Sequence, residues 1–483
     1  MRTAEHVREL DLPVMSMRLA DLADARLAIW GFGREGRAAL AVLRRRFPEK
    51  RLAVFCSAAE ADALSAVGGL GNDADKRLQL ITTAADAQAL TQFDVVIKSP
   101  GISPYKAPAA PALLAGVRFT SGTALWFAEH PDVRTICVTG TKGKSTVTAL
   151  IAHILRNGGQ RVALAGNIGL PLLDLLDVGG PDKPPAPDWW VIELSSFQTR
   201  DFAGAPTIAV INNLYEEHLD WHGTSERYVA DKLAIAAGAR QLVVNAQADL
   251  LAATAAHARR SVFGAAAGWH VRDSAIWSGD ERVLPLGGLP LPGEHNALNV
   301  CAALASIEAA GFDALELAAH VVTFKPLPHR LQRIGTRDGV DYVNDSIATT
   351  PYATIEALRS LEDRPVVVLV GGFDRGVDWE PFVRHVAAHA PAAIVTMGAN
   401  GAAIAAALRR IAEPRFALDA TASLADALAR ARDLAPGGAA ILLSPGAPSF
   451  DQFRDYAERG REFARLAGFD PASIAQIEGL GIA

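Results

Sequence analysis

This sequence of 483 residues has few cysteines, no long apolar run and no excess of basic charge. Its three cysteines, Cys56, Cys137 and Cys301, lie far apart, which excludes a disulfide framework and zinc-site spacing and favours a reducing cytoplasm. The 47 Lys+Arg and 53 Asp+Glu give a formal charge of -6, which excludes a broad nucleic-acid surface. No apolar run reaches about 18 residues, and the N-terminus carries acids throughout, so neither a membrane span nor a signal peptide is expected.

What the sequence does contain is an alternation of short β-rich runs and helical patterns. At roughly 150 residues per domain, the length suggests about three domains. The first block, up to about Pro131, contains RLAIW, RLAVFC and DVVIKSPGISP, and the second opens with RTICVTG and contains WWVIELSS, TIAVINN and RQLVVN. The third follows FKPLPHRL and contains VDYVND, RPVVVLVGG, AAIVTMGA and AAILLSPG. This alternation predicts an α/β protein with doubly wound parallel sheets covered by helices.

The strongest single motif is VTGTKGKST over residues 138–146, where a β-rich run leads into a glycine loop and then a helix. Backbone N–H groups and the helix N-terminus can cradle phosphates, Lys144 can reach the terminal phosphoryl oxygens, and the Ser145 hydroxyl can ligate magnesium. The loop is shorter than the usual G-x-x-x-x-G-K-[ST] motif, and a glycine-rich turn with a solvated lysine is the alternative. We predict a nucleotide triphosphate site formed by Gly140, Thr141, Lys142, Gly143, Lys144, Ser145 and Thr146.

A second glycine motif, GFGREG over residues 31–36, matches the dinucleotide pattern G-x-G-x-x-G. A nicotinamide site would place an acid at the end of the next strand, and this sequence has Cys56 and Ser57 there. That difference argues against NAD. Two interpretations of GFGREG remain: a tight turn that packs the helix against the strand, or a site for another nucleotide diphosphate.

Polar residues at predicted strand ends are candidate metal ligands. Glu193 ends the run WWVIE, where the carboxyl edge of an open sheet presents its ligands, and a carboxylate suits magnesium. His218, in NNLYEEHLDWHG, either contacts metal or substrate or is solvated. Lys232 lies on a predicted helix and by pattern alone is a surface lysine.

Several further polar residues have more than one interpretation. Asn296 and Asn299 stand at a predicted helix start, where capping is the ordinary explanation. Arg330 and Asp345 could serve a nucleotide from another domain, and residue patterns alone do not decide this.

The ordered motifs TGTKGKST, GNIGLP, ELSSFQ, HLDWHG with a downstream lysine, EHNALN, LPHR, NDS and LSPGAPSFDQF together resemble the Mur ligase superfamily, and within it the glutamate-adding MurD type. The resemblance covers nearly the whole chain. It implies a Rossmann-like UDP-substrate domain (1–130), a central P-loop ATPase domain (131–327) and a Rossmann-like amino-acid domain (328–483). It also implies ATP and Mg²⁺ as cofactors, with an acyl phosphate formed on UDP-N-acetylmuramoyl-L-alanine and attacked by the amine of glutamate.

Site roles follow from the same resemblance. Lys144, His218 and Lys232 become the catalytic residues, with Lys232 a carbamylated lysine, and Ser145, Glu193, His218 and Lys232 hold the metal. The nucleotide is expected to contact Asn296, Arg330 and Asp345. The substrates are expected to contact Asn167, Thr349, Arg375, Ser449, Phe450 and Tyr456.

Departures near the glutamate site bear on its stereochemistry. D-glutamate enzymes of the superfamily often show NDSKAT, whereas this sequence has NDSIAT with Ile347, and its final loop reads LSPGAPSFDQF. Together with the GTALWFAEH and HLDWHG stretches, this resembles the branch that adds L-glutamate and relies on a separate epimerase afterwards. The alternative is the same reaction with D-glutamate, and a stereochemical preference is set by few side chains. We expect a cytoplasmic, monomeric enzyme of peptidoglycan synthesis.

Other classes of protein share only one or another of these motifs with this sequence. Folylpolyglutamate synthases share the phosphate loop, as does the superfamily member that adds a diamino acid, but its D-N-P-[RK] motif is missing here. A nucleotide-regulated switch would need no equivalents of Glu193, His218 and Lys232. An oxidoreductase would rest on GFGREG alone.

Overall fold

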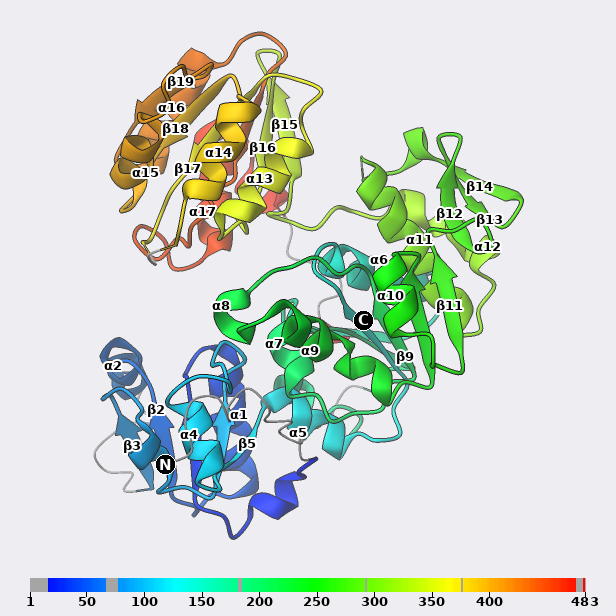
Figure 1. The fold of residues 1–483 in the computed structure, drawn as a ribbon, viewed down its shortest axis with the longest axis vertical. Coiled ribbons are helices and arrows are strands. Elements are labelled where there is room, and N and C mark those ends of the chain that lie inside the picture. Colours follow the sequence, from blue (N-terminus) through cyan, green and yellow to red (C-terminus); the bar gives the residue numbers. More distant parts are fainter. Residues whose placement is uncertain are drawn as a thin grey trace. The chain divides into compact units, whose positions relative to one another are not determined.

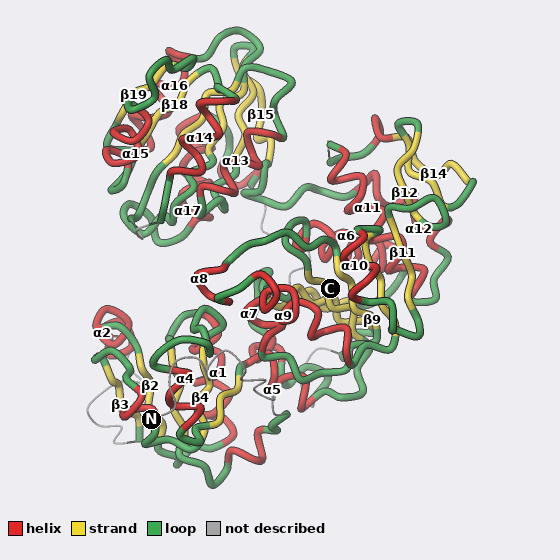
Figure 2. Tube along the Cα trace, viewed as in Figure 1, coloured by secondary structure: helices red, strands yellow, loops and turns green. Residues whose placement is uncertain are grey.

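The computed structural model describes residues 16–66, 77–180, 185–291, 293–374, 377–474 and 481–482. They form two compact units, Met1–Phe324 with Gly479–Ala483 (unit 1) and Lys325–Glu478 (unit 2) (Figures 1 and 2). No helix within these described ranges is long and apolar enough to cross a membrane.

Unit 1 begins with a five-stranded parallel sheet in the order β3-β2-β1-β4-β5. Strands such as LAVF and VVIK are buried along their whole length, as expected of a sheet covered on both faces. The strands are β1 (Leu27–Trp30), β2 (Leu52–Phe55), β3 (Leu78–Ile81), β4 (Val95–Lys98) and β5 (Arg118–Thr120). The helices are α1 (Arg34–Arg46), α2 (Ala58–Ala66), α3 (Ala87–Leu90), α4 (Ala109–Leu114) and α5 (Gly122–Glu129).

The central sheet of unit 1 has the order β11-β10-β9-β6-β8-β7-β21. Because β6 lies between β8 and β9 and runs parallel to both, the loops that follow these three strands meet at one edge. The strands are β6 (Thr135–Thr139), β7 (Val162–Gly166), β8 (Trp189–Glu193), β9 (Ile208–Ile211), β10 (Gln241–Asn245), β11 (Arg260–Phe263) and the antiparallel β21 (Gly481–Ile482). The helices are α6 (Lys144–Asn157), α7 (Ser196–Arg200), α8 (Leu219–His222), α9 (Ser225–Ala237), α10 (Ala248–Ala253), α11 (Glu294–Ala309) and α12 (Ala314–Leu317).

A small antiparallel sheet that the sequence did not predict completes unit 1. It consists of β12 (Trp269–Arg272), β13 (Ala275–Ser278) and β14 (Glu281–Pro285). Its short strands are only partly buried and lack the continuous apolar runs of the parallel strands. A search for apolar runs therefore finds the buried parallel strands but does not detect β12, β13 and β14.

Unit 2 contains a six-stranded sheet in the order β15-β16-β20-β17-β18-β19, with β15 antiparallel to β16 and the others parallel. Because β20 lies between β16 and β17, the loops after β16 and β20 are adjacent. The strands are β15 (Gln332–Arg337), β16 (Val340–Asn344), β17 (Val366–Val370), β18 (Ala393–Thr396), β19 (Ala417–Ala420) and β20 (Ala440–Leu443). The helices are α13 (Pro351–Arg359), α14 (Glu380–Ala388), α15 (Gly401–Leu408), α16 (Leu424–Leu434) and α17 (Tyr456–Ala467).

The predicted α/β class is confirmed, since each of the apolar runs named from the sequence contains a strand. The N-terminal and central sheets of unit 1 share one buried core, in which Trp126 of α5 packs against Trp190 of β8 with ring centroids 4.6 Å apart. That shared core explains why they form a single compact unit. The finer division at residues 130 and 327 stays a prediction.

Candidate active site

The phosphate loop joins β6 to α6, as the sequence predicts. Gly140 and Gly143 have φ values of 146° and 77°, in the region that favours glycine. A Cβ atom on Gly143 would lie 2.3 Å from Oδ1 of Asn299 and 2.5 Å from Nδ2 of Asn212, so a side chain there would displace both amides. No side chain caps the N-terminus of the fourteen-residue helix α6, whose first residues are Lys144, Ser145 and Thr146. The geometry is that of an anion-binding loop at a helix start.

Two asparagines that follow β9 shape this loop, and the sequence analysis missed both. Asn212 donates through Nδ2 to the Lys142 carbonyl (2.9 Å) and to Oδ1 of Asn299 (2.8 Å). Asn213 accepts at Oδ1 from the Lys142 N–H, 2.8 Å away. The available signal was the pair NN after the buried run TIAVI, because that strand pairs with β6. The expectation that Asn299 caps a helix is wrong, since it lies inside α11 and is buried against the loop.

Asn296 also lies inside α11, one turn before Asn299, and does not cap it. Its Oδ1 accepts a hydrogen bond of 3.2 Å from Nδ2 of Asn299, which ties Asn296 to the phosphate loop. The lysines of the loop point to different partners. Lys144 donates from Nζ to the Thr141 carbonyl at 3.0 Å, and Lys142 pairs with Oε1 of Glu217 at 2.9 Å.

Glu193 ends β8 at the edge of the central sheet where β6 delivers the phosphate loop. Its side chain is 1% exposed, and Oε1 accepts a hydrogen bond from Nδ2 of Asn167 at 2.6 Å. The other oxygen, Oε2, is buried and has no hydrogen-bond partner among the described residues. A buried, unpartnered carboxylate oxygen is costly unless something binds it, and it is the donor type that Mg²⁺ prefers.

Lys232 is buried in α9 and not on the surface, so its interpretation as a surface lysine is wrong. Its Nζ donates to the Gly140 carbonyl at 2.8 Å. Burial lowers the pKa of Lys232 well below the usual lysine range, and the positive charge of Lys144 lowers it further, against the opposing effects of Glu217 and Glu193. The structure therefore places a buried amine, whose protonated form is disfavoured, beside the phosphate loop.

His218 immediately precedes α8 and has a positive φ of 56°. Its Nε2 lies 3.8 Å from Oε2 of Glu217. Burial lowers the pKa of His218, and the charges of Lys232 and Lys144 act on it in the same direction, whereas Glu217 raises it. His218, Lys232 and Lys144 therefore lie close together. The charge of Lys144 lowers the pKa values of both His218 and Lys232, and the charge of Glu193 raises that of Lys232.

The described residues contain no group of three His, Cys, Asp or Glu side chains arranged to hold a metal ion. Mg²⁺ typically binds one or two protein carboxylates together with water and substrate phosphates, so such a cluster is not required. The unpartnered Oε2 of Glu193, beside a phosphate loop, fits a magnesium ion.

In unit 2, Asp345 follows β16 and Ser444 follows β20, and the two adjacent loops are joined by a hydrogen bond of 2.8 Å from Ser444 Oγ to Asp345 Oδ2. Oδ1 of Asp345 accepts from the Leu331 N–H at 3.1 Å, next to Arg330. Burial raises the pKa of Asp345 to about 7, although the charge of Arg330 opposes this. Arg330 and Asp345 are therefore neighbours in unit 2.

The expected glutamate-binding residues lie around the same edge of unit 2. Ser449 is buried, Phe450 is 66% exposed with its ring 6.2 Å from that of Phe373, and Tyr456 begins α17. Thr349 lies between Asp345 and α13. Arg375 falls outside the described residues.

One organising residue of unit 2 was missed entirely. Arg459 of α17 is buried, and its guanidinium donates to Oγ and the carbonyl of Ser346 and to the carbonyls of Ala447 and Pro448, at 2.9–3.2 Å. It therefore ties the loop after β16 to the loop after β20. The sequence alone presents Arg459 as one of several arginines on a helix rich in charge.

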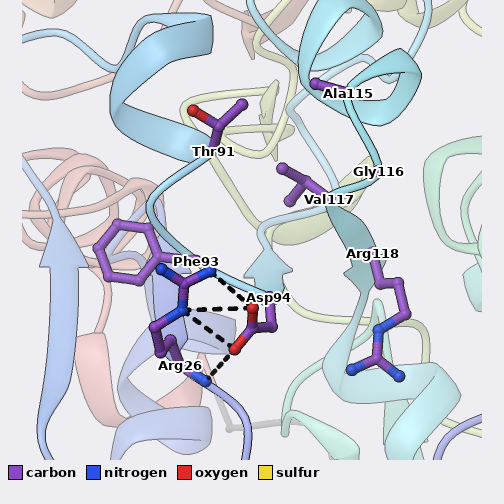
Figure 3. A pocket seen from close by; sticks show the side chains of 8 residues that line it. All are labelled: Arg26, Thr91, Phe93, Asp94, Ala115, Gly116, Val117 and Arg118. Carbon is purple, nitrogen blue, oxygen red and sulfur yellow. Dashed lines mark hydrogen bonds and ion pairs between the residues drawn. The ribbon is translucent and has the colours of Figure 1, made fainter.

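A separate hollow lies at the amino ends of β1, β4 and β5, the opposite edge of the N-terminal sheet from the glycine turn (Figure 3). Arg26 and Asp94 lie side by side in its wall and are joined by a guanidinium–carboxylate hydrogen bond of 2.7 Å. Ligands of open parallel sheets bind at the carboxyl edge, so this hollow is no candidate active site.

Comparison with known proteins gives one consistent family. Residues 138–307 match the Mur ligase middle domain, and residues 329–446 match the Mur ligase glutamate ligase domain. A curated relative from Xanthomonas axonopodis pv. citri, named UDP-N-acetylmuramoyl-L-alanine--L-glutamate ligase, is 50% identical over 96% of this chain and 100% of its own length. One of the same name from Salinispora tropica is 39% identical over 93% of this chain and 98% of its own.

Solved structures agree at the level of the fold. UDP-N-acetylmuramate-alanine ligase MurC from Thermotoga maritima has a TM-score of 0.56 at 17% identity and covers 92% of this chain and 99% of its own. MurF ligase from Thermotoga maritima, solved in complex with ADP, has a TM-score of 0.53 at 14% identity and covers 96% and 99% of the two chains.

Proposed function

Since the chain belongs to the Mur ligase family, we propose that it is an ATP-dependent ligase that joins L-glutamate to UDP-N-acetylmuramoyl-L-alanine in peptidoglycan precursor synthesis. The observation that carries this proposal is the convergence, at one sheet edge, of a phosphate loop, the unpartnered oxygen of Glu193 and the buried amine of Lys232. A protein that only bound a nucleotide would need the loop without the buried carboxylate and amine.

The phosphate loop is assigned to the triphosphate of ATP. The N–H groups of residues 140–146 and the N-terminus of α6 face the phosphates, and Lys144 moves from the Thr141 carbonyl to the terminal phosphoryl oxygens. Asn296, Arg330 and Asp345 are assigned to the rest of the nucleotide. ADP is the ligand of the Thermotoga MurF structure, whose fold this chain shares.

Magnesium would be held by Ser145, Glu193, His218 and Lys232, and when bound it neutralises the negative charge that gathers during phosphoryl transfer. An unmodified lysine amine is a poor ligand for this hard cation, so we propose that Lys232 is carbamylated. Its neutral Nζ forms a bond with the carbon of carbon dioxide and loses a proton, which converts the amine into an anionic carboxylate-type group. The lowered pKa of Lys232 supports this, because only the unprotonated amine reacts.

The proposed reaction has two steps. An oxygen of the alanyl carboxylate attacks the terminal phosphorus of ATP, which forms an acyl phosphate and releases ADP. The amine of glutamate then attacks the acyl carbon, and phosphate leaves with its bonding electrons while the amine loses a proton. Lys144 and the loop N–H groups stabilise the charge on the transferring phosphoryl group.

The substrates are assigned to both units. Asn167, which is exposed and bonded to Glu193, contacts the UDP-sugar, and Thr349, Arg375, Ser449, Phe450 and Tyr456 contact glutamate. Ile347 stands where the D-glutamate enzymes often have a lysine, so this chain lacks that cation. The L-enantiomer then fits the relatives' name and leaves inversion to a separate epimerase. We propose a monomer in the cytoplasm, in line with three free cysteines.

The test is ADP release by the purified protein with UDP-N-acetylmuramoyl-L-alanine, ATP and each enantiomer of glutamate, with the amide product identified by mass spectrometry. We expect turnover with L-glutamate at least tenfold faster than with D-glutamate. A preference for D-glutamate would contradict the stereochemical assignment, and the absence of an amide with either would contradict the ligase.

A further inference from the structure

A buried hydrogen-bond network lies beside the candidate site and is used by none of the steps above. It contains Ser196, His222, Asp231 and Tyr105, and we call it the positioning network. Oγ of Ser196 lies 3.0 Å from Nε2 of His222, and Nδ1 of His222 lies 2.7 Å from Oδ2 of Asp231. The hydroxyl of Tyr105 lies 2.6 Å from Oδ1 of Asp231.

The direction of these hydrogen bonds follows from their chemistry. A carboxylate only accepts, so Asp231 accepts from the Tyr105 hydroxyl and from Nδ1–H of His222. Nε2 of His222 is hydrogen-bonded to the Ser196 hydroxyl, so both ring nitrogens have a partner and the ring orientation is fixed. Arg200 lies 3.6 Å from Oδ1 of Asp231 and balances its charge.

Three members of the network lie within four residues of a residue assigned to the metal. Ser196 begins α7, three residues after Glu193, and His222 ends α8, four residues after His218. Asp231 immediately precedes Lys232 in α9. The helices α7 and α8 both pack against α9 (Figure 1). The network therefore joins α7, which follows Glu193, α8, which follows His218, and α9, which contains Lys232.

Tyr105 brings the N-terminal sheet into the same network. It belongs to the loop after β4, which is fastened to the central sheet by several further contacts. Lys98, the last residue of β4, forms a buried ion pair of 2.5 Å with Asp201. Ser103 donates to the carbonyl of Trp221 at 2.6 Å, and Nε1 of Trp221 donates to the Gly101 carbonyl at 3.0 Å.

The order serine, histidine, aspartate is also that of a hydrolase triad. Ser196 is 2% exposed and His222 is fully buried, which leaves no surface for a substrate to reach them. The second oxygen of Asp231 is bonded to Tyr105, which comes from a different sheet. The burial of Ser196 and His222 and the bond between Asp231 and Tyr105 therefore indicate that these side chains hold their surroundings in position and do not react with a substrate.

We propose that the Ser196–His222–Asp231–Tyr105 network sets the relative positions of Glu193, His218 and Lys232, and that Tyr105 links this geometry to the N-terminal sheet. Its members are positioning residues that touch neither metal nor substrate. This inference rests on the proposed function for the identity of the site. Partners that orient metal-binding side chains typically change metal affinity or activity about 10–100-fold when they are altered.

The test compares full-length wild type with Tyr105→Phe, which removes one hydroxyl and keeps the ring that packs on Trp221 and under Arg227. Mn²⁺ binding in the presence of ADP is measured by electron paramagnetic resonance, together with kcat and the KM for glutamate. We expect about tenfold weaker Mn²⁺ binding and about tenfold lower kcat, with the KM for glutamate unchanged.

Tyr342→Phe is the matched control, because the Tyr342 hydroxyl accepts a hydrogen bond from Arg432 in unit 2 and has no part in the network. It should leave Mn²⁺ binding and kcat within twofold of wild type. Ser196→Ala, at the other end of the network, should weaken Mn²⁺ binding in the same direction as Tyr105→Phe.

Wild-type Mn²⁺ affinity in Tyr105→Phe, or in Ser196→Ala if Tyr105→Phe does not fold, would overturn the proposal. The Mn²⁺ readout does not depend on turnover. A wild-type protein that forms no amide would therefore contradict the proposed ligase, while the effect of Tyr105→Phe on Mn²⁺ binding would still decide the role of the network.

Discussion

Each unit of this protein buries a basic side chain at its candidate site, Lys232 in unit 1 and Arg459 in unit 2, and the two are held in different ways. Among the described residues, Nζ of Lys232 in unit 1 makes a single hydrogen bond, to the Gly140 carbonyl, and burial lowers the pKa of Lys232 well below the usual range. Arg459 in unit 2 donates to four acceptors, and although burial lowers its pKa to about 10, it stays charged at neutral pH.

The difference teaches which buried cation is suited to chemistry. A lysine that gives up its proton becomes a nucleophilic amine and can be modified, whereas a guanidinium cannot be deprotonated under physiological conditions and presents a rigid fork of donors. Lys232 is therefore suited to the metal site, and Arg459 is suited to holding the loops that carry Asp345 and Ser449 in place.

The largest effect is expected from Lys232→Met. Loss of the amine removes the carbamylation site beside the phosphate loop, so turnover should fall roughly 10³-fold. Stability to urea should stay equal or rise, because an apolar side chain replaces a buried polar amine. Lys50→Met, at a partly exposed lysine that bonds to the Ala23 carbonyl, is the control and should keep full turnover. An active Lys232→Met enzyme would refute the role of this lysine.

Arg459→Met should have the opposite profile. Three carbonyls and the Ser346 hydroxyl lose their donor in the interior, so the free energy of unfolding of unit 2 should fall by about 3–5 kcal/mol. Urea unfolding monitors this, and steady-state kinetics should show a raised KM for glutamate in the fraction that remains folded. Arg459→Lys should recover only part of the loss, because it lacks the fork geometry. If the free energy of unfolding of Arg459→Met equalled that of wild type, Arg459 would not stabilise unit 2, and the difference described between Arg459 and Lys232 would be wrong.

Glu193→Gln tests whether the site that contains Lys232 binds magnesium through the Glu193 carboxylate. The amide keeps a hydrogen-bond acceptor for Asn167 but loses the negative charge and one carboxylate oxygen. Turnover should fall roughly 10²-fold, and Mn²⁺ binding in the presence of ADP should weaken. If Mn²⁺ affinity were unchanged in Glu193→Gln, the magnesium assignment would have to move to other residues.

The smallest effect concerns pH. The pKa of Asp345 is raised to about 7 by burial, above the roughly 3.9 of an unfolded chain, so the folded state holds a proton that the unfolded state has lost. Its contribution to stability is full below about pH 4, falls as pH rises to about 7 and is lost above that.

Asp345→Asn should remove this pH dependence from the unfolding of unit 2. Glu35, whose pKa burial also raises to about 7, gives the matched variant Glu35→Gln in unit 1. Urea unfolding between pH 4 and 8 measures both. An unchanged slope in Asp345→Asn would show that its carboxyl group is already ionised in the folded protein.

The strands and the phosphate loop could be predicted from the sequence because their signals are local. A buried parallel strand needs an apolar run, and a phosphate loop needs glycines at fixed spacing before a helix, so both survive without knowledge of the neighbours. The partly buried strands β12–β14 give no such signal, and they were missed.

The burial of Lys232 depends on what packs around α9. A local signal was nevertheless present, because the buried residues Tyr228, Asp231, Lys232 and Ile235 follow the spacing of one helix face. Two charged residues on an inward face should have marked the position as unusual. The local sequence carries a weaker signal for Asn213 and Arg459, because their hydrogen-bond partners come from loops distant in sequence.

The most direct test of the central claim uses UDP-N-acetylmuramoyl-L-alanine labelled with ¹⁸O in the alanyl carboxylate, together with ATP and L-glutamate. Because one carboxylate oxygen becomes the bridge of the acyl phosphate and leaves with phosphorus, the account predicts one ¹⁸O atom in each phosphate released. Phosphate without ¹⁸O, in a reaction that still forms the amide, would contradict the acyl phosphate and the role assigned to the phosphate loop.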